Sequence, residues 1–577
     1  MGIPKLTSYI KETNRIVQTN IRNMSSIVID GYALCYKLYL GVKSGDYCQF
    51  YKKVTAYLSD LNREIKVYVV IDGVDCENRK LETSRRRDGQ RLQRLWQIDS
   101  RVDELSPFEI VISFMAKTVF IDAVCDSSVK YFVADGEADQ DVVRLANHLC
   151  CPVFGFDSDY LIFNIEGGYI PIDDGRGGVT NLHGVVPCFT YHSFDSAYNL
   201  SSDARLLIPY CVGNDFHGSN ALPELQIEKY ASVGTVVSKL KGRVKFDDFQ
   251  NTVAEDYKFY RVDPHSFEEL SQSRFLSRFN PLVPEWVVMQ FKVGQFSHIS
   301  MRFLASKDTK TWNYTIAIED VNKESASEVT NTVFPFIAGA LLSLERCETP
   351  PVRVCRKPKS YNFEANKVAL LDRHRNILGS FNLLNIRDCP SEDREMNLLR
   401  VFHCKSVCKT LRKIPDELKL AVVASRCWLK SVIHSIDHQF KAFILALVFC
   451  FHTCYSRSRS EFEIPPNEMG RLRRIHHLAQ WECMMHLVID FNQILGSPFP
   501  YTSLGHLFST TVFLNFFTSQ PDSLDSKLDE EGTRDIYDAI TKKLLPDAPV
   551  EPVRQAQVVR APRPQAIVTQ NRFAQLS

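Results

Sequence analysis

The chain has 577 residues, of which 45% are hydrophobic and 24% are charged, and this length and apolar content predict more than one packed domain. The formal net charge of +1 excludes a global excess of positive charge, so binding of nucleic acid would depend on local basic patches. The 17 cysteines follow no regular spacing and no secretory signal precedes them, so we expect reduced thiols in an intracellular protein. The longest apolar run, residues 442–451, is too short for a bilayer span, and no membrane contact is predicted.

Apolar runs rich in β-formers alternate with helical patterns over roughly the first 200 residues. The strand-like runs are Ser26–Asp30, Val67–Asp72, Tyr131–Ala134 and Pro152–Phe156. Helical spacing of apolar residues follows the first run, at 51–61, and again follows Glu137. This alternation predicts an α/β fold with a parallel sheet.

Changes in composition divide the rest of the chain. Residues 351–361 combine proline with several Lys and Arg residues, so we expect a basic linker that ends the α/β region at about residue 350. The apolar spacing in 362–545 is mainly helical and predicts an α-helical second domain. Residues 546–577 are rich in Pro, Gln, Val and Arg and predict a disordered tail.

Acidic residues follow the predicted strands. Three runs lead into Asp30, Asp72 and Asp157, and the carboxyl ends of parallel strands lie at one edge of a sheet, where ligands bind. The further acidic residues in this part of the chain that we assign to the same edge are Glu137, Asp139, Asp159 and Asp215. A single aspartate after a strand is often only a turn former or helix N-cap, so the prediction rests on the joint pattern.

Several carboxylates in one cleft repel each other unless cations keep them ionised, so the pattern predicts bound divalent metal. Ligands that are all oxygen favour Mg²⁺ or Mn²⁺ over zinc. Two such ions can activate water and stabilise the leaving oxygen in phosphodiester hydrolysis. The residues therefore predict a two-metal phosphodiesterase.

At these positions the sequence resembles the flap-endonuclease superfamily of PIN-like nucleases. The matching motifs, in order, are Met1-Gly-Ile, Ile-Asp30-Gly, Val-Ile-Asp72-Gly, Glu137-Ala-Asp139, Asp157-Ser-Asp159 and Gly-Asn-Asp215. The resemblance covers roughly residues 1–220 and implies a nuclease domain within 1–350. It also implies that Asp30, Asp72, Glu137 and Asp139 serve one metal ion, and that Asp157, Asp159 and Asp215 serve the second.

Within the superfamily the chain most resembles the Asteroid proteins. The segments that carry this likeness are Met1–Tyr9, Gly213–Phe216, Ile414–Leu418 and Arg426–Leu429. The resemblance implies a DNA endonuclease.

Residues 79–101 hold eight Lys or Arg residues against three acidic residues, and a helix here would place cations beside the metal site. A solvated charged helix is the alternative interpretation. The resemblance assigns substrate binding to Arg79 and Arg86, and we predict the same role for Lys80 of this basic segment. It also places Gly2 near the site.

The sequence departs from the family pattern in two ways. The glycine-rich hairpin that grips duplex DNA is missing after Asp215, where the chain has residues 217–225, so we expect single-stranded or overhang DNA as substrate. Asp139 is one methylene shorter than the glutamate more common in the family, which leaves the strength of the first metal site open. The end of the chain contains no sliding-clamp motif.

Two other interpretations stay open at this point. The chain could be a nuclease-like scaffold that binds RNA or proteins through the helical region without cutting. The Cys and His residues at 403–408 and 450–454 could bind zinc, although they equally fit apolar helix faces. The residues do not decide between DNA and RNA, and a DNA substrate would favour the nucleus over the cytoplasm.

Overall fold

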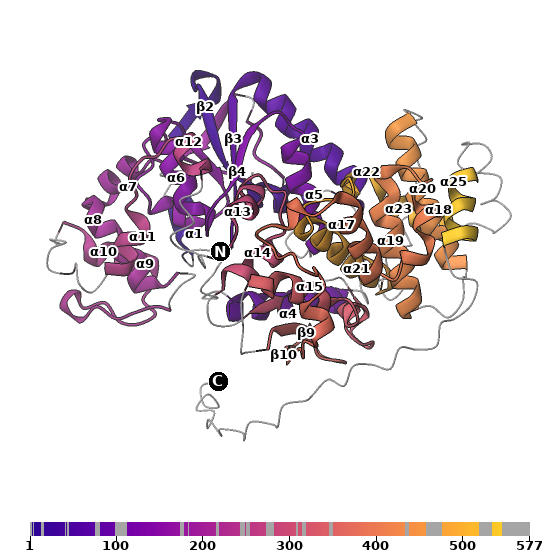
Figure 1. The fold of residues 1–577 in the computed structure, drawn as a ribbon. Coiled ribbons are helices and arrows are strands. Elements are labelled where there is room, and N and C mark those ends of the chain that lie inside the picture. The colour runs from indigo at the N-terminus through magenta and orange to yellow at the C-terminus, as the bar shows by residue number, and fades with distance from the viewer. Residues whose placement is uncertain are drawn as a thin grey trace.

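The computed structural model describes residues 3, 5–12, 17–40, 42, 45–74, 81–98, 112–173, 178–182, 184–214, 218–242, 249, 254–272, 282–306, 310–313, 319–344, 350–432, 438–456, 476–518 and 534–544. A parallel sheet with the strand order β4-β3-β2-β5-β6 lies at the centre of the N-terminal region (Figure 1). Its strands are β2 (Ser26–Asp30), β3 (Lys66–Ile71), β4 (Lys130–Val133), β5 (Val153–Gly155) and β6 (Tyr169–Pro171). The predicted parallel α/β sheet is confirmed.

Both faces of this sheet are covered, as expected for parallel strands joined by helices. Alternate residues of a strand point to opposite faces. Ile27 and Ile29 of β2 belong to one apolar core, which also contains residues of α3 (Tyr47–Glu64) and α5 (Phe114–Cys125). Val28 belongs to the other core, together with residues of α6 (Ala138–His148). The strand runs are therefore apolar throughout because neither face meets solvent.

Shorter elements surround the sheet. The further helices of the N-terminal half are α1 (Leu6–Glu12), α2 (Gly31–Tyr39), α4 (Leu81–Ile98), α7 (Tyr191–Tyr198), α8 (Ser202–Arg205), α9 (Leu207–Val212), α10 (Val233–Leu240), α11 (Ala254–Tyr260) and α12 (Phe267–Ser271). Strand β1 (Val17–Asn20) pairs antiparallel with β7 (Val185–Cys188). Helix α4 shows that residues 81–98 of the basic segment are helical. A Cβ on Gly89 of α4 would lie 2.7 Å from the Tyr361 carbonyl oxygen, so α4 packs against the segment after β9 (Val352–Arg356). Helix α15 (Phe334–Leu341) precedes β9.

The segment that we expected to be a basic linker is instead part of a small sheet. Strand β9 lies between β8 (Thr311–Asn313) and β10 (Phe363–Lys367). The Arg356 side chain is buried, and its Nε donates to Glu319 Oε1 at 2.6 Å. Basic residues that pair with a buried carboxylate have the same composition as solvated linker residues, so the sequence could not separate the two cases.

The C-terminal half is helical, as predicted. Helices α13 (Glu285–Lys292) and α14 (His298–Ala305) precede this half. The helices within it are α16 (Asp372–Arg375), α17 (Ser391–Val401), α18 (Cys408–Leu411), α19 (Asp416–Val432), α20 (His438–Ser456), α21 (His476–Ile494), α22 (Leu504–Leu507), α23 (Thr510–Thr518) and α25 (Arg534–Asp538). No helix in the described ranges combines the length and the apolar character that a membrane crossing needs. The expected disordered tail, 546–577, lies outside the described residues.

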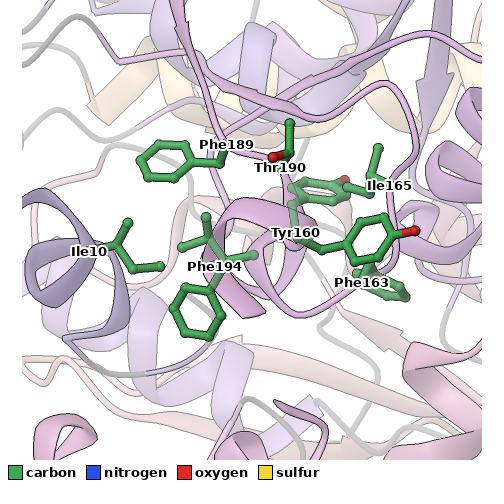
Figure 2. A pocket seen from close by; sticks show the side chains of 9 residues that line it. Ile10, Tyr160, Phe163, Ile165, Phe189, Thr190 and Phe194 are labelled. Atoms are coloured by element: carbon green, nitrogen blue, oxygen red, sulfur yellow. The ribbon is translucent and has the colours of Figure 1, made fainter. Parts of the chain in front are cut away.

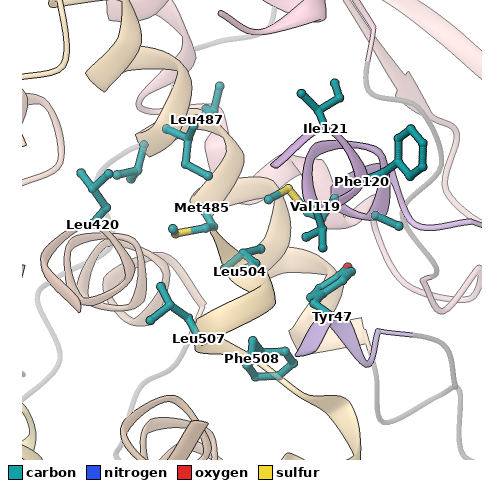
Figure 3. Close-up of a cluster of buried hydrophobic side chains, with 14 of the residues drawn as sticks. Tyr47, Val119, Phe120, Ile121, Leu420, Met485, Leu487, Leu504, Leu507 and Phe508 are labelled. Carbon is teal, nitrogen blue, oxygen red and sulfur yellow. The ribbon is translucent and has the colours of Figure 1, made fainter. Parts of the chain in front are cut away.

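The helical half packs directly against the sheet's helices. Figure 3 shows Met485 of α21 and Leu504 of α22 in the same buried cluster as Val119 of α5 and Tyr47 of α3. A polar contact crosses the same boundary, because Tyr47 Oη donates to Glu482 Oε1 of α21 at 2.5 Å. One continuous core thus joins the α/β region to the helical region. The domain boundaries themselves stay predictions.

Candidate active site

The strand order of the sheet brings the predicted acidic residues together. Asp30 is the last residue of β2, Asp72 follows β3, and Asp157 follows β5. The segment after β4 leads to Glu137, which is the N-cap residue of α6. Because β4, β3, β2 and β5 are consecutive neighbours in the sheet, their carboxyl ends form one edge. Asp30 and Asp157 therefore lie at the same edge although 127 residues separate them in the sequence.

Asp30 and Asp72 each use one oxygen to cap a helix. Asp30 Oδ1 accepts from the backbone N–H of Ala33 at 3.1 Å, at the start of α2. Asp72 Oδ1 accepts from the backbone N–H of Ala138 at 2.8 Å, at the start of α6. Asp30 is therefore the N-cap residue of α2, whereas Asp72 accepts from the first turn of α6, whose N-cap residue is Glu137. A carboxylate has a second oxygen, so capping does not exclude a role in the site.

Three further carboxylates form a compact group. One oxygen each of Asp139, Asp157 and Asp159 lies within 4.8 Å of the other two. Two tyrosines hold this group. Tyr160 Oη lies 3.0 Å from Asp139 Oδ1 and 3.2 Å from Asp30 Oδ2, and Tyr260 Oη donates to Asp159 Oδ1 at 3.1 Å. Tyr160 thus connects the compact group to Asp30.

Burial and mutual repulsion raise the pKa values of these carboxyls. Burial, and then the negative charges of Asp72 and Asp157, raise the pKa of Asp30 to about 7. Burial again comes first for Asp139, whose pKa lies well above its usual value, followed by the charges of Asp157, Asp30, Asp72 and Glu137. The carboxyls that interact in this way are those of Asp30, Asp72, Glu137, Asp139 and Asp157. Cations would remove the repulsion that raises these pKa values, and the all-oxygen donor set suits Mg²⁺ or Mn²⁺.

Gly73 permits the close approach of β3 and β4 at this edge. A Cβ at Gly73 would lie 2.0 Å from the carbonyl oxygen of Ala134. The Gly73 N–H donates to the carbonyl of Gly136 at 2.7 Å. This contact joins the turn after Asp72 to the segment that carries Glu137.

Sequence reasoning missed several residues that support the site. His298 of α14 is within hydrogen-bond distance of the Asp72 carbonyl oxygen, with Nε2 at 2.8 Å, and burial lowers the pKa of this imidazole to about 4. Lys292 of α13 donates to Asp135 Oδ1 at 2.5 Å. Tyr160 directly follows Asp159 and could have been noticed there. His298, Lys292 and Tyr260 lie in segments that carry no motif, so no local signal marks them.

Four of the predicted site residues, Gly2, Arg79, Lys80 and Asp215, lie outside the described residues. Ile3 is described, and its backbone N–H donates to Ser158 Oγ at 2.7 Å. Ser158 lies between Asp157 and Asp159, so the chain next to Gly2 is bonded to the acidic turn. Arg86 is exposed on α4, and its role in substrate binding stays a prediction.

An apolar pocket lies behind the acidic turn and is separate from the carboxylates. Figure 2 shows Tyr160, Phe163 and Phe194 among its lining residues, with Ile10 of α1 on another side. None of the acidic site residues lines it. Its aromatic rings support the turn that holds Asp157 and Asp159.

Comparison with known proteins gives relatives over most of the chain. No family model matches the sequence. The human protein named single-strand DNA endonuclease ASTE1 is 21% identical over 586 residues, covering 89% of this chain and 85% of the human protein. The Drosophila melanogaster protein asteroid is 34% identical over 181 residues, which are 30% of this chain and 20% of the fly protein. A solved structure of the catalytic core of Rad2 in complex with DNA substrate is 16% identical and covers 50% of this chain and 85% of that chain, but its TM-score of 0.30 is too low to support an argument. The chain is therefore similar to the ASTE1 proteins over most of its length and to protein asteroid over a shorter part, in agreement with the resemblance to the Asteroid family that its motifs indicate.

Proposed function

We propose that this protein is a divalent-metal-dependent DNA endonuclease that hydrolyses phosphodiester bonds in single-stranded or overhang DNA. The observation that carries the proposal is the convergence of carboxylates from four adjacent strand ends. Asp30, Asp72 and Asp139 share one electrostatic environment, and Asp139, Asp157 and Asp159 are within reach of a common cation. The name of the human relative, a single-strand DNA endonuclease, supports the substrate class.

We propose the carboxylates as ligands of two metal ions. Asp30, Asp72, Glu137 and Asp139 would hold one ion, and Asp157, Asp159 and Asp215 the other. When bound, such ions would lower the pKa of water and stabilise charge on the phosphate oxygens. The protein's own contribution is to hold the carboxylates in place, through helix caps at Asp30 and Asp72 and through the hydroxyls of Tyr160 and Tyr260.

Arg79, Lys80, Arg86 and Gly2 remain proposed substrate-binding residues. A DNA substrate would place the protein in the nucleus. The helical half is the proposed surface for protein partners.

Cleavage assays test this proposal. Labelled single-stranded, 3′-overhang, 5′-flap and duplex DNA, and single-stranded RNA, would be incubated with the wild type and with the double variant Asp157→Asn plus Asp159→Asn. Asp372→Asn, on exposed α16, is the control for loss of one carboxylate. We expect Mg²⁺- or Mn²⁺-dependent cleavage of single-stranded or overhang DNA that the double variant loses and the control keeps.

Thermal unfolding in parallel shows that the variants fold, and it detects metal binding as a metal-dependent rise in the wild type's Tm. A folded wild type that cleaves no substrate with any metal would contradict the proposal and favour a non-catalytic scaffold. Efficient cleavage of 5′ flaps alone would contradict the substrate class.

A further inference from the structure

Two cations and two aromatic rings gather behind Asp72, on the side of the site that faces α14. We call Tyr32, Tyr36, Lys117 and Arg302 the cationic-aromatic cluster. The tyrosines come from α2, Lys117 from α5 and Arg302 from α14. No motif of the sequence marks these residues, and none of them has a place in the proposed metal site.

The cluster is connected to the metal-site edge by short contacts. Lys117 Nζ lies 4.4 Å from the ring centroid of Tyr32 and 5.9 Å from that of Tyr36. The Tyr32 ring lies 6.2 Å from the ring of His298, centroid to centroid. His298 in turn contacts the Asp72 carbonyl oxygen at 2.8 Å. Arg302 follows His298 by four residues and therefore lies on the same face of α14.

The charges of Asp72 and Arg302 act on the same side chain, that of Tyr32. Burial, and then the charge of Asp72, raise the pKa of Tyr32, whereas the Arg302 guanidinium acts in the opposite direction. The Tyr32 hydroxyl therefore interacts electrostatically with both the Asp72 carboxylate and the Arg302 guanidinium. The positive charges of Arg302 and Lys117 also help to lower the pKa of the His298 imidazole.

The two cations have no ion-pair partner within the part of the chain that the structure describes. Arg302 Nε is buried without a hydrogen-bond partner there, and no described carboxylate forms a salt bridge with Arg302 or Lys117. The buried carboxyl of Asp88 on α4 is paired with Arg91 at 3.5 Å, and the charges of Lys117 and Arg302 also act on Asp88, since both oppose the rise of its pKa. The Asp88 carboxyl is thus shared among Arg91, Lys117 and Arg302, and this excess of positive charge favours the binding of a further anion.

We propose that Arg302 and Lys117 bind a phosphate of the substrate strand next to Asp72, and that Tyr32 supports this phosphate-binding subsite. The inference rests on the proposed nuclease function and extends it. Guanidinium and ammonium groups are the usual ligands of nucleic-acid phosphates, and aromatic rings beside them favour single strands with accessible bases. Because Arg302 comes from α14, a helix beyond the sequence motifs completes the strand-binding surface.

Binding of a labelled single-stranded oligonucleotide, measured by fluorescence anisotropy with Ca²⁺ in place of Mg²⁺, tests the subsite. The variants are Arg302→Gln, Arg302→Lys and Lys117→Gln. Arg63→Gln on α3 is the matched control, because Arg63 is exposed and precedes β3 at the opposite edge of the sheet. Thermal unfolding confirms that each variant is folded.

We expect Arg302→Gln and Lys117→Gln to weaken binding roughly tenfold. The slope of log Kd against log salt concentration should fall by about 0.7 for each lost phosphate contact. Arg302→Lys should retain most of the slope, and Arg63→Gln should match the wild type. In cleavage assays the weaker binding should appear mainly as a higher KM.

An unchanged Kd and salt slope in folded Arg302→Gln and Lys117→Gln, with a wild type that cleaves DNA, would overturn this inference alone. Weaker binding without a change in salt slope would also overturn it, because a purely structural role alters folding rather than phosphate contacts. A wild type that neither binds nor cleaves would overturn the proposed function together with this inference.

Discussion

The hydroxyl of Tyr160 lies 3.0 Å from Oδ1 of Asp139, within hydrogen-bond distance of a carboxylate contributed by another element of the fold. The same hydroxyl is 3.2 Å from Asp30 Oδ2. A hydroxyl has one hydrogen, so it donates to only one carboxylate at a time and can accept from the other only when that group is protonated. The raised pKa of Asp139 is consistent with such a shared proton.

Tyr160→Phe should therefore loosen the position of Asp139 and Asp30 without removing a proposed metal ligand. Partners of metal ligands typically contribute about 10- to 100-fold in metal affinity or activity. We expect the metal concentration for half-maximal cleavage to rise by about tenfold, with a smaller effect at saturating metal. Titration of Mn²⁺ and Mg²⁺ in the cleavage assay measures this. An unchanged titration curve would show that the hydroxyl is not needed to orient the carboxylates.

Gly73→Ala should disturb the edge of the sheet at which the carboxylates meet. The added Cβ would lie 2.0 Å from the Ala134 carbonyl oxygen, so the ends of β3 and β4 would have to separate. Gly136→Ala is a matched control in the facing segment, because its Cβ would meet nothing within 4 Å. We expect Gly73→Ala to lower both Tm and cleavage, and Gly136→Ala to be near the wild type in Tm. Equal Tm values for the two variants would contradict the close-approach argument.

Lys292→Met should destabilise the segment between β4 and α6. The Lys292 ammonium is buried and donates to Asp135 Oδ1 at 2.5 Å and to the carbonyls of Val133 and Leu270, each at 3.0 Å. Removing one partner of a buried ion pair typically costs about 3 kcal/mol or more, because the remaining charge loses its partner.

Urea unfolding measures this loss, with the exposed Lys405→Met as control. The double variant Lys292→Met plus Asp135→Asn should regain part of the free energy of unfolding, since it removes the uncompensated carboxylate. A double variant whose losses simply add would contradict a direct interaction.

Glu482 should make the stability of the protein depend on pH. Burial raises the pKa of Glu482 from 4.5 to about 7, although hydrogen bonds from Tyr47 and Ser113 oppose the shift. Because the folded-state pKa exceeds the unfolded one, the stabilisation from the neutral carboxyl is complete below about pH 4.5 and is lost as the pH rises through about 7.

Between these two pH values the free energy of unfolding should decrease by about 2–3 kcal/mol. Glu482→Gln keeps a neutral side chain at every pH, so its Tm should fall less than that of the wild type between pH 5 and pH 8, a range of about three units that spans the titration. Thermal unfolding across this range provides the measurement. Parallel curves for the two proteins would show that Glu482 does not carry the effect.

The sequence by itself predicted the parallel sheet and the helical C-terminal half, because strands buried on both faces and amphipathic helices leave local patterns. It also predicted which carboxylates would meet, since Asp30, Asp72 and Asp157 each follow a strand and parallel strands end at one edge. The expected linker was wrong, because composition cannot distinguish a solvated arginine from Arg356 buried against Glu319.

Only the tertiary structure decided which side chains support the site from a distance. Tyr260 meets Asp159 across 101 residues, and His298 meets Asp72 across 226. Arg302 reaches the same region because α14 packs beside α2. Such contacts depend on how separate elements pack together, and neither periodicity nor a motif records that packing. Local sequence patterns predict the edge of the sheet that carries the carboxylates, whereas long-range packing determines which side chains support this edge and which form its proposed phosphate contacts.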